Sequence, residues 1–351
     1  MQLFKPFHAW IIVIACLSLF HPAHAQKPAP TVNGQPVEVQ IKILINEIVD
    51  ISTVDETFDL DGYLTLVWKD SAALDLYPEL TTGTKVIYHE DAVANIVGQE
   101  LWFPNLEFMN SAEPREIASR RIELTGDQVL YTERFQAKIL SNTNLTAFPF
   151  DTQVFSLEIE SFGFNGDQMT LVPMEREADI SENIKNDAWS FTKSESRSYE
   201  YAYPSPIGSD FGRTVYFSRF EFSIPATRRI GYFIWQFFLP LFILIVATWF
   251  IPTLWKAGFA QELVFTMLLT SVMFSFYTSS FLPQLSYNTF LEAIVIVSNG
   301  IVFLTLVLVL IRREKSGRFQ WIHNGWTVPI ISILAYAFTI WLFFEDTLFI
   351  G

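Results

Sequence analysis

One carboxylate begins a long uncharged stretch that is unusually polar for its length. No charged residue lies between Glu262 and Glu292, and residues 263–282 would form a helix of roughly the 30 Å that a bilayer core requires. Steps of four and three from Glu262 place a carboxylate, a hydroxyl and then apolar groups on one face. That face consists of Glu262, Thr266, Leu269, Met273 and Phe276. Such a face could attract cations at its polar end and exclude water along its apolar part.

A second face of the same helix competes with the first. Met267, Ser271, Ser275 and Thr278 repeat with the same period, so spacing alone leaves open which face is wet. In either case, hydroxyl groups inside a membrane usually face protein or water rather than lipid. Because one helix cannot enclose water, we expect several copies of the chain to surround a common axis.

The N-terminal residues have the pattern of a secretory signal peptide. Lys5 precedes an apolar run over residues 9–20, and Ala23-His24-Ala25 provides small residues for cleavage. We therefore assign residues 1–25 to a signal peptide, with an uncleaved anchor as the alternative. An exported domain outside the cell membrane is expected to follow.

Enzyme and metal chemistry are not indicated. Cleavage would remove Cys16, the single cysteine, and would leave only His89 and His323 of the five histidines. The sequence has no CxxC, HExxH or glycine-rich phosphate motif. We expect no disulfide, no metal, no cofactor and no enzymatic activity.

Acidic residues dominate the exported part. Residues 26–230 hold 32 Asp and Glu against 17 Lys and Arg, a balance that would repel nucleic acid and concentrate cations. An ordinary solvated acidic surface explains the same numbers. No nucleic-acid partner is expected.

The periodicity changes once along the chain. Residues 37–45 alternate between apolar and mostly polar types, as in a half-buried strand, and further aromatic and β-branched runs follow between turn residues. These runs are residues 63–68, 129–137, 154–159 and 214–224. The pattern predicts an immunoglobulin-like all-β sandwich over residues 26–229.

Apolar helices are expected in the remainder, residues 230–351. Four membrane spans are predicted at about residues 230–251, 259–282, 289–311 and 326–346. Basic residues after Arg229 fall only in the loops after the first and third spans, which makes those loops cytoplasmic. The sandwich and the C-terminus then lie outside a cell (inner) membrane. Pro240 in the first span would free a backbone carbonyl.

Several motifs resemble the Cys-loop receptors, the pentameric ligand-gated ion channels. Phe148-Pro149-Phe150-Asp151 resembles their signature loop, and Trp102-Phe103-Pro104 and Asp61-Gly62-Tyr63 resemble two of their binding loops. The two family cysteines would fall at Ser141 and Phe155, so the disulfide is missing, and the loop over residues 312–325 is short. Both departures resemble the prokaryotic members.

The resemblance implies a homopentamer of four further copies in membrane lipid that passes cations. It implies opening by a small extracellular ligand such as an amine, or by protons or hydroxide. The implied agonist-binding residues are Tyr63, Arg120, Tyr131, Glu160, Phe162, Asp187, Tyr203 and Phe217. The implied pore-lining residues are Glu262, Thr266, Leu269, Met273 and Phe276.

A third set would couple the outer domain to the pore. It comprises Asp55, Phe148, Pro149, Phe150, Asp151, Arg228 and Pro283. Asp151 and Arg228 are expected to form a buried ion pair, with Asp55 as its third member. Phe148 and Phe150 are expected to press on residues 283–287.

Other interpretations remain open from the residues alone. A membrane-anchored sensor without a pore would have four lipid-facing spans, and a secondary transporter would have an inverted repeat, which the sequence lacks. Trp68 and Trp102 are better explained as core residues than as ligand contacts. Arg120 and Asp187 could be solvated surface residues as readily as site residues, and Tyr131 could be either.

Overall fold

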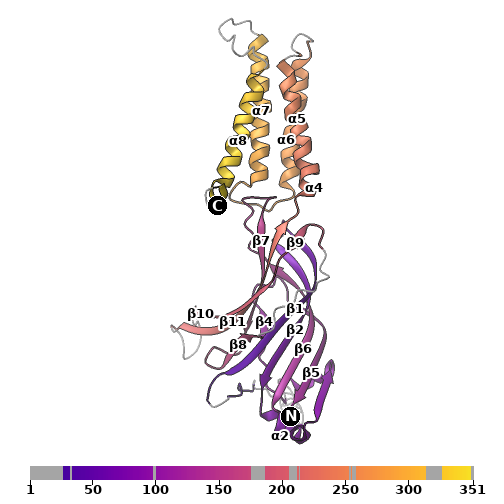
Figure 1. Ribbon diagram of the computed structural model, residues 1–351, viewed down its shortest axis with the longest axis vertical. Helices are drawn as coiled ribbons and strands as arrows, with labels where there is room; N and C mark the ends of the chain where they lie inside the picture. Colours follow the sequence, from indigo (N-terminus) through magenta and orange to yellow (C-terminus); the bar gives the residue numbers. More distant parts are fainter. Residues whose placement is uncertain are drawn as a thin grey trace, which may run out of the picture.

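The computed structural model describes residues 27–31, 34–97, 100–174, 186–204, 212, 214–252, 254, 258–313 and 326–348. Strands gather at one end of the molecule and four long helices at the other (Figure 1). The predicted signal peptide, residues 1–25, lies outside the described residues, as do most of the basic cytoplasmic loop residues.

Two sheets form the outer domain. The first has six strands in the order β3-β5-β6-β2-β1-β8. Its strands are β1 (Val37–Ser52), β2 (Thr57–Lys69), β3 (Lys85–His89), β5 (Glu116–Thr125), β6 (Gln128–Leu140) and β8 (Met169–Pro173). Short helices α2 (Ala72–Leu76), η1 (Pro78–Thr82) and α3 (Asp91–Ile96) connect β2 to β3 and follow β3.

The second sheet carries most of the residues that matter below. Its order is β10-β11-β7-β4, with β9 also paired to β11. These strands are β4 (Leu106–Phe108), β7 (Thr152–Ser161), β9 (Trp189–Phe191), β10 (Glu195–Pro204) and β11 (Thr214–Arg228). The predicted all-β sandwich is confirmed, and each predicted run lies within a strand.

Side chains that alternate along the strands fill the space between the sheets. The alternate residues of β1 point into this space and are all 0 or 1% exposed, as a period of two requires: Val37, Val39, Ile41, Ile43 and Ile45. Trp68 and Trp102 are buried in the same core with ring centroids 5.9 Å apart. Both were expected to be core residues, and this is confirmed.

Four helices are long and apolar enough to cross a membrane. They begin with α4 (Gly231–Phe233), a π-helical segment η3 (Ile234–Phe238) and α5 (Leu239–Phe250), which together form the first span. The others are α6 (Ala260–Ser279), α7 (Phe290–Arg313) and α8 (Thr327–Leu348). The π-helical turn ends at Phe238, two residues before Pro240, which cannot donate the hydrogen bond that an α-helix needs there.

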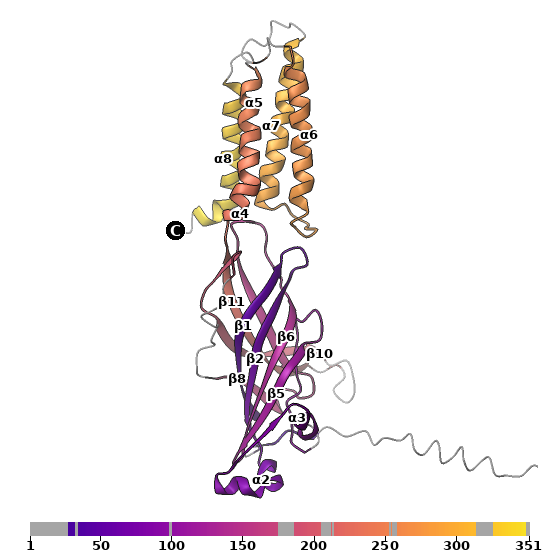
Figure 2. The same ribbon diagram turned by 90° about the vertical axis from the view of Figure 1, so that its right-hand side faces the viewer.

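The end of the helix bundle nearest the sandwich holds the loop between α6 and α7 and the last turns of α8 (Figure 2). The first residues of α6 lie at the far end of the bundle. With the sandwich outside, Glu262 is therefore at the cytoplasmic end of α6.

Candidate functional site

The predicted pore residues share one face of α6. Leu269, Met273 and Phe276 are 66%, 60% and 69% exposed, and Glu262 and Thr266 are exposed as well. Within the described part of the chain, no other element covers this face. Because these are large apolar groups, a single chain leaves a surface here that must meet other copies, lipid or a dewetted space.

The competing face of α6 packs inside the helix bundle. Ser271 and Thr278 are 0 and 1% exposed, and Met267 packs against buried residues of the bundle. Asn299 of α7 donates a 2.7 Å hydrogen bond to the Ser275 hydroxyl. The two faces of α6 have the same periodicity, but within one chain the first is exposed and the second is packed against the bundle.

A buried ion pair lies where the sandwich meets the helices. Arg228, the last residue of β11, donates from Nε and Nη2 to the two carboxylate oxygens of Asp151 at 2.8 and 3.1 Å. Both side chains are less than 10% exposed. The guanidinium also lies over the rings of Phe148 and Trp189, at 4.7 and 4.2 Å. A planar cation held by two bonds and two rings has little freedom to move alone.

The third partner of this pair is not the one predicted. Arg228 Nη1 donates to the Thr53 hydroxyl at 3.2 Å, whereas Asp55 is exposed and accepts a hydrogen bond from Ser52. The predicted turn between β1 and β2 does reach Arg228. Residues two apart in a tight turn point in different directions, so the turn presents Thr53 instead of Asp55.

The loop over residues 145–148 holds the start of α7. The backbone N–H groups of Phe290 and Leu291 donate to the carbonyls of Thr146 and Phe148, at 2.8 and 3.1 Å. The first N–H groups of a helix have no partner within that helix; this loop satisfies two of them, and the Thr289 hydroxyl accepts the N–H of Glu292. The N–H of Leu145 also donates to the Tyr287 hydroxyl at 3.1 Å.

Phe148 and Phe150 make different contacts. Phe148 is 1% exposed and packs with Leu282 and Leu291, next to Pro283, and the Phe148–Pro149 peptide is cis. Phe150 instead contacts the rings of Phe238, Phe290 and Phe344, from the first, third and fourth spans. Of the two rings predicted to press on residues 283–287, Phe148 belongs to a cluster against which Leu285 packs, whereas Phe150 faces the helices.

A cluster of charged and aromatic groups covers the outer face of the second sheet. Arg219 of β11 lies directly opposite Glu160 of β7, and its Nε donates to that carboxylate at 3.0 Å. Its Nη1 donates to Glu158 at 2.7 Å and its Nη2 to the Tyr203 hydroxyl. The Arg219 side chain is 7% exposed.

Aromatic rings enclose the same guanidinium. Its carbon lies 3.8 Å from the ring centroid of Tyr201 and 5.9 Å from that of Tyr203. Phe217, which pairs with Tyr201 across the hairpin, contacts Tyr203 edge to face. The geometry is that of an aromatic cage with a carboxylate floor, and the chain's own Arg219 stands inside it.

Burial dominates the acid–base behaviour of Glu160. It raises the pKa of the carboxyl above its ordinary value of 4.5, although the hydrogen bond from Arg219 acts in the opposite direction. The Glu160 side chain is 5% exposed. As the pH falls, Glu160 is therefore protonated at a higher pH than an exposed glutamate is.

Phe162 stands apart from that cluster on its own chain. It is 79% exposed, just after β7, and its backbone N–H bonds to the carbonyl of Asn105. A ring this exposed has no packing partner within the described part of one chain. It is available to a neighbouring copy.

Tyr63 and Arg120 lie on the opposite side of the domain. They line a hollow of about 450 Å³ on the first sheet, together with His89, Arg121 and Arg134. Within one chain they do not meet Glu160 or Tyr203, because they belong to the other sheet. They could meet those residues only across an interface between copies.

Two predicted agonist residues lie elsewhere. Tyr131 points into the core, where it is 3% exposed and its hydroxyl donates to Glu133 at 2.6 Å. Asp187 precedes β9, which pairs with the last residues of β11, at the membrane end of the sheet. Neither residue joins the cluster around Arg219 in the described structure.

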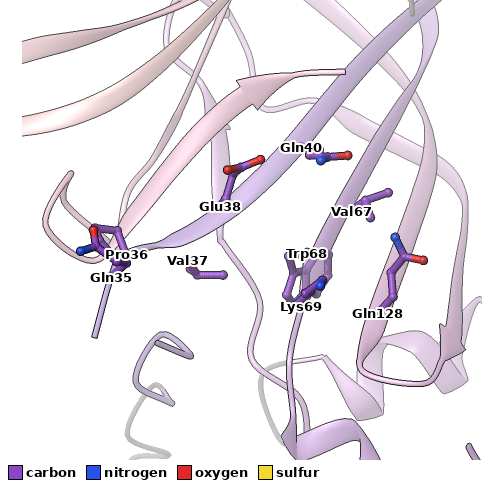
Figure 3. A pocket seen from close by; sticks show the side chains of 9 residues that line it. All are labelled: Gln35, Pro36, Val37, Glu38, Gln40, Val67, Trp68, Lys69 and Gln128. Atoms are coloured by element: carbon purple, nitrogen blue, oxygen red, sulfur yellow. The ribbon is translucent and has the colours of Figure 1, made fainter. Parts of the chain in front are cut away.

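A further hollow lies at the end of the first sheet most distant from the four membrane-spanning helices. Figure 3 shows Glu38, Gln40, Lys69 and Gln128 around it, and the buried Trp68 also lines it. Its volume is about 410 Å³. It contains none of the predicted binding residues.

Sequence reasoning missed the centre of the cluster, Arg219. Two signals were present: Phe217-x-Arg219-x-Glu221 on one strand and Glu158-x-Glu160 on another each repeat with a period of two. Their complementary charges would have suggested adjacent strands. Nothing in the sequence states the register that places Arg219 opposite Glu160.

The fold and this arrangement define a class of membrane receptor. Residues 16–219 match the neurotransmitter-gated ion-channel ligand binding domain. The chain belongs to this family of ligand-gated ion channels, which are not enzymes, and it is a multi-pass membrane protein with its N-terminal domain outside.

Known members of the family differ in what opens them. The chain is 23% identical to a proton-gated ion channel of Gloeobacter violaceus, over 98% of this chain and 94% of that protein. It is 24% identical to the γ-aminobutyric acid receptor subunit rho-3 of Rattus norvegicus, over 81% of this chain and 60% of that protein. A serotonin-gated chloride channel of Caenorhabditis elegans is 23% identical, over 77% of this chain and 54% of that protein. The chain thus spans little more than half the length of these animal relatives.

Proposed function

We propose that five copies of this chain form a cation-selective channel, lined by α6 and opened from outside by a small ligand or a change in pH. The observation that carries the proposal is the face of α6 that no other described element covers. It presents a carboxylate, a hydroxyl and three large apolar groups in that order. A fivefold ring of such helices would have an acidic cytoplasmic mouth and an apolar constriction.

Cation selectivity depends on Glu262. Five carboxylates in one ring would concentrate cations and repel anions. The named relatives include a chloride channel, so anion selectivity is the alternative. Glu262, at the cytoplasmic end of α6, favours cations.

The opening signal is proposed to act where two copies meet. One copy contributes Glu160, Phe162, Tyr203 and Phe217 from the outer face of the second sheet. The next copy contributes Tyr63 and Arg120 from its hollow. Phe162, exposed on its own chain, would fill part of that hollow.

A change in pH could act on this site through Glu160. Protonation of Glu160, whose pKa burial raises, would remove one of the two carboxylates that hold Arg219. The similarity to a proton-gated channel also favours this route. A ligand could act on the same pairing by competing for Glu160 or Glu158.

The signal would pass to the pore through the junction. Asp151, Arg228 and Thr53 join two strands and a turn at the base of the sandwich. From there, the loop over residues 145–148 bonds both the α6–α7 loop and the start of α7. A shift of this loop would move the outer end of α6.

Recording from purified protein in planar bilayers tests the proposal. Currents are measured during pH steps between 4 and 9 and during application of small amines and carboxylates, with asymmetric KCl to obtain reversal potentials. We expect stimulus-dependent currents with a reversal potential near that of potassium. Absence of current from verified pentamers under every stimulus would favour a sensor without a pore, and reversal near the chloride potential would refute cation selectivity.

A further inference from the structure

The guanidinium of Arg219 satisfies the chemistry that a ligand cation would otherwise find in this site. Its three nitrogens bond Glu160, Glu158 and Tyr203, and its flat face lies 3.8 Å from the Tyr201 centroid. A cation between an aromatic face and carboxylates is the arrangement by which proteins bind ammonium and guanidinium groups. All the groups of such a site are present, and the cation that occupies it is a side chain of the same protein.

We propose that Arg219 is a built-in cation that occupies the aromatic cage and excludes small free cations from it. This inference rests on the proposal that the outer face of the second sheet forms the agonist site. It makes Arg219 the residue that sets ligand specificity. With Arg219 in place, a simple amine meets a filled cage; without it, the same rings and carboxylates form an empty site for a small cation.

Burial supports this reading over a surface ion pair. Arg219 is 7% exposed at the side chain and Glu160 is 5% exposed, so removal of the guanidinium leaves a desolvated carboxylate without its partner. Binding of a free cation would restore a partner to this carboxylate. The space vacated by truncation has the size and shape of a guanidinium bonded on three sides.

The same hairpin provides a matched control. Arg197 pairs with Glu221 at 2.7 Å and lies 5.4 Å from the ring of Tyr199. Its side chain, however, is 71% exposed. It has the same residue types and the same kind of contacts, but solvent can replace them.

The test is chemical rescue of full-length pentamers carrying Arg219→Ala. Binding of methylguanidinium and ethylammonium is followed by calorimetry and by the melting temperature. We expect Arg219→Ala to bind methylguanidinium with a Kd on the order of 1 mM, at least about tenfold tighter than the wild type and Arg197→Ala bind it. Its lowered melting temperature should recover as methylguanidinium is added.

A second variant guards against misfolding. Arg219→Ala with Glu158→Gln leaves only one unpaired carboxylate and should fold more readily, with weaker but saturable binding. If either variant elutes as a folded pentamer and binds no cation, the inference is wrong. Equal binding by the wild type or by Arg197→Ala also overturns it.

Channel currents separate this inference from the proposed function. If Arg219→Ala binds methylguanidinium and the cation opens the pore, both stand. If the variant binds the cation and its currents do not change, the cage exists but the agonist site lies elsewhere. In that case the filled cage stands, and the proposed location of the agonist site fails together with the role of Arg219 in agonist specificity.

Discussion

Glu160, Tyr203 and Phe217, which the family resemblance implies as agonist-binding residues, lie together on the outer face of the second sheet with the rings that an amine would need. Because Arg219 lies among them at 3.8 Å from Tyr201, the ring cluster and its carboxylates are already used. At this scale, the identity of one side chain decides which ligands the surrounding residues accept.

Phe162 and Phe217 give the most direct test of where an agonist binds. Loss of one ring that faces a bound cationic or polar ligand should shift the activation midpoint about two-fold to thirty-fold, corresponding to about 0.5–2 kcal/mol. Phe162→Ala and Phe217→Ala are compared with the parent by dose–response recording. If both variants respond to every agonist as the parent does, the site is misplaced.

Glu160 should leave a signature in stability as a function of pH. Because burial raises its pKa above 4.5, its contribution to stability is present while it is protonated, below about pH 4.5, and is lost as pH rises through the folded pKa. The melting temperature of Glu160→Gln relative to the parent should therefore increase between pH 4 and 8. Any pH-gated current that depends on this group should disappear in the same variant.

Glu158→Gln is the control for that experiment. It removes the other carboxylate that bonds Arg219, but its side chain is 31% exposed, against 5% for Glu160. A pH-dependent difference of the same size in Glu158→Gln would mean that loss of any Arg219 partner, rather than titration of Glu160, produces the effect.

At the scale of elements, the strands and the membrane spans could be predicted from the sequence more fully than the contacts between them. The strands could be predicted because a period of two persists over long runs, and the spans because charges vanish over about 20 residues. The contacts between elements were harder to predict from the sequence. Thr53 in place of Asp55, and Phe150 against three helices, depend on the exact direction of turn residues, which the pattern of residue types does not encode.

Arg228 tests the junction. Removing one partner of a buried pair commonly destabilises by about 3–5 kcal/mol, since the remaining charge is left unpaired. Arg228→Ala should therefore abolish gating or assembly, measured by current and by elution as a pentamer. Arg229→Ala, at the adjacent exposed position, should behave as the parent. Normal gating by Arg228→Ala would exclude this pair from coupling.

Tyr287 tests the connection between loops. Its hydroxyl accepts the N–H of the buried Leu145, and a hydrogen bond of this kind contributes about 0.5–1.5 kcal/mol net. Tyr287→Phe should raise the agonist or proton concentration needed for half-activation about two- to twelve-fold, with little change in assembly. Tyr216→Phe, a half-exposed ring far from the junction, serves as the comparison, and equal shifts in both variants would argue against a specific role.

At the scale of the whole molecule, one chain is visibly incomplete. The exposed ring of Phe162, the hollow that contains Tyr63 and Arg120, and the apolar face of α6 each lack a partner within the described residues. A closed ring of identical copies would cover Phe162 and the hollow at each interface, and the same rotation would turn the α6 faces toward the common axis. Family membership supports such assembly, and the number of copies is testable by native mass spectrometry of the purified protein.

Charge selectivity is the property that only the assembly possesses, and Glu262 is expected to set it. In a pentamer its five carboxylates would lie on one ring, and at about 10 Å in water-like dielectric each pair repels by only about 0.4 kcal/mol. The ring should therefore draw cations to the mouth, while Leu269, Met273 and Phe276 close the resting pore by dewetting. Glu262→Gln should lower conductance and shift the reversal potential in asymmetric salt toward zero. A Glu262→Gln channel with the selectivity and conductance of the parent would mean that Glu262 lies in bulk water and that another part of the pore selects the ion.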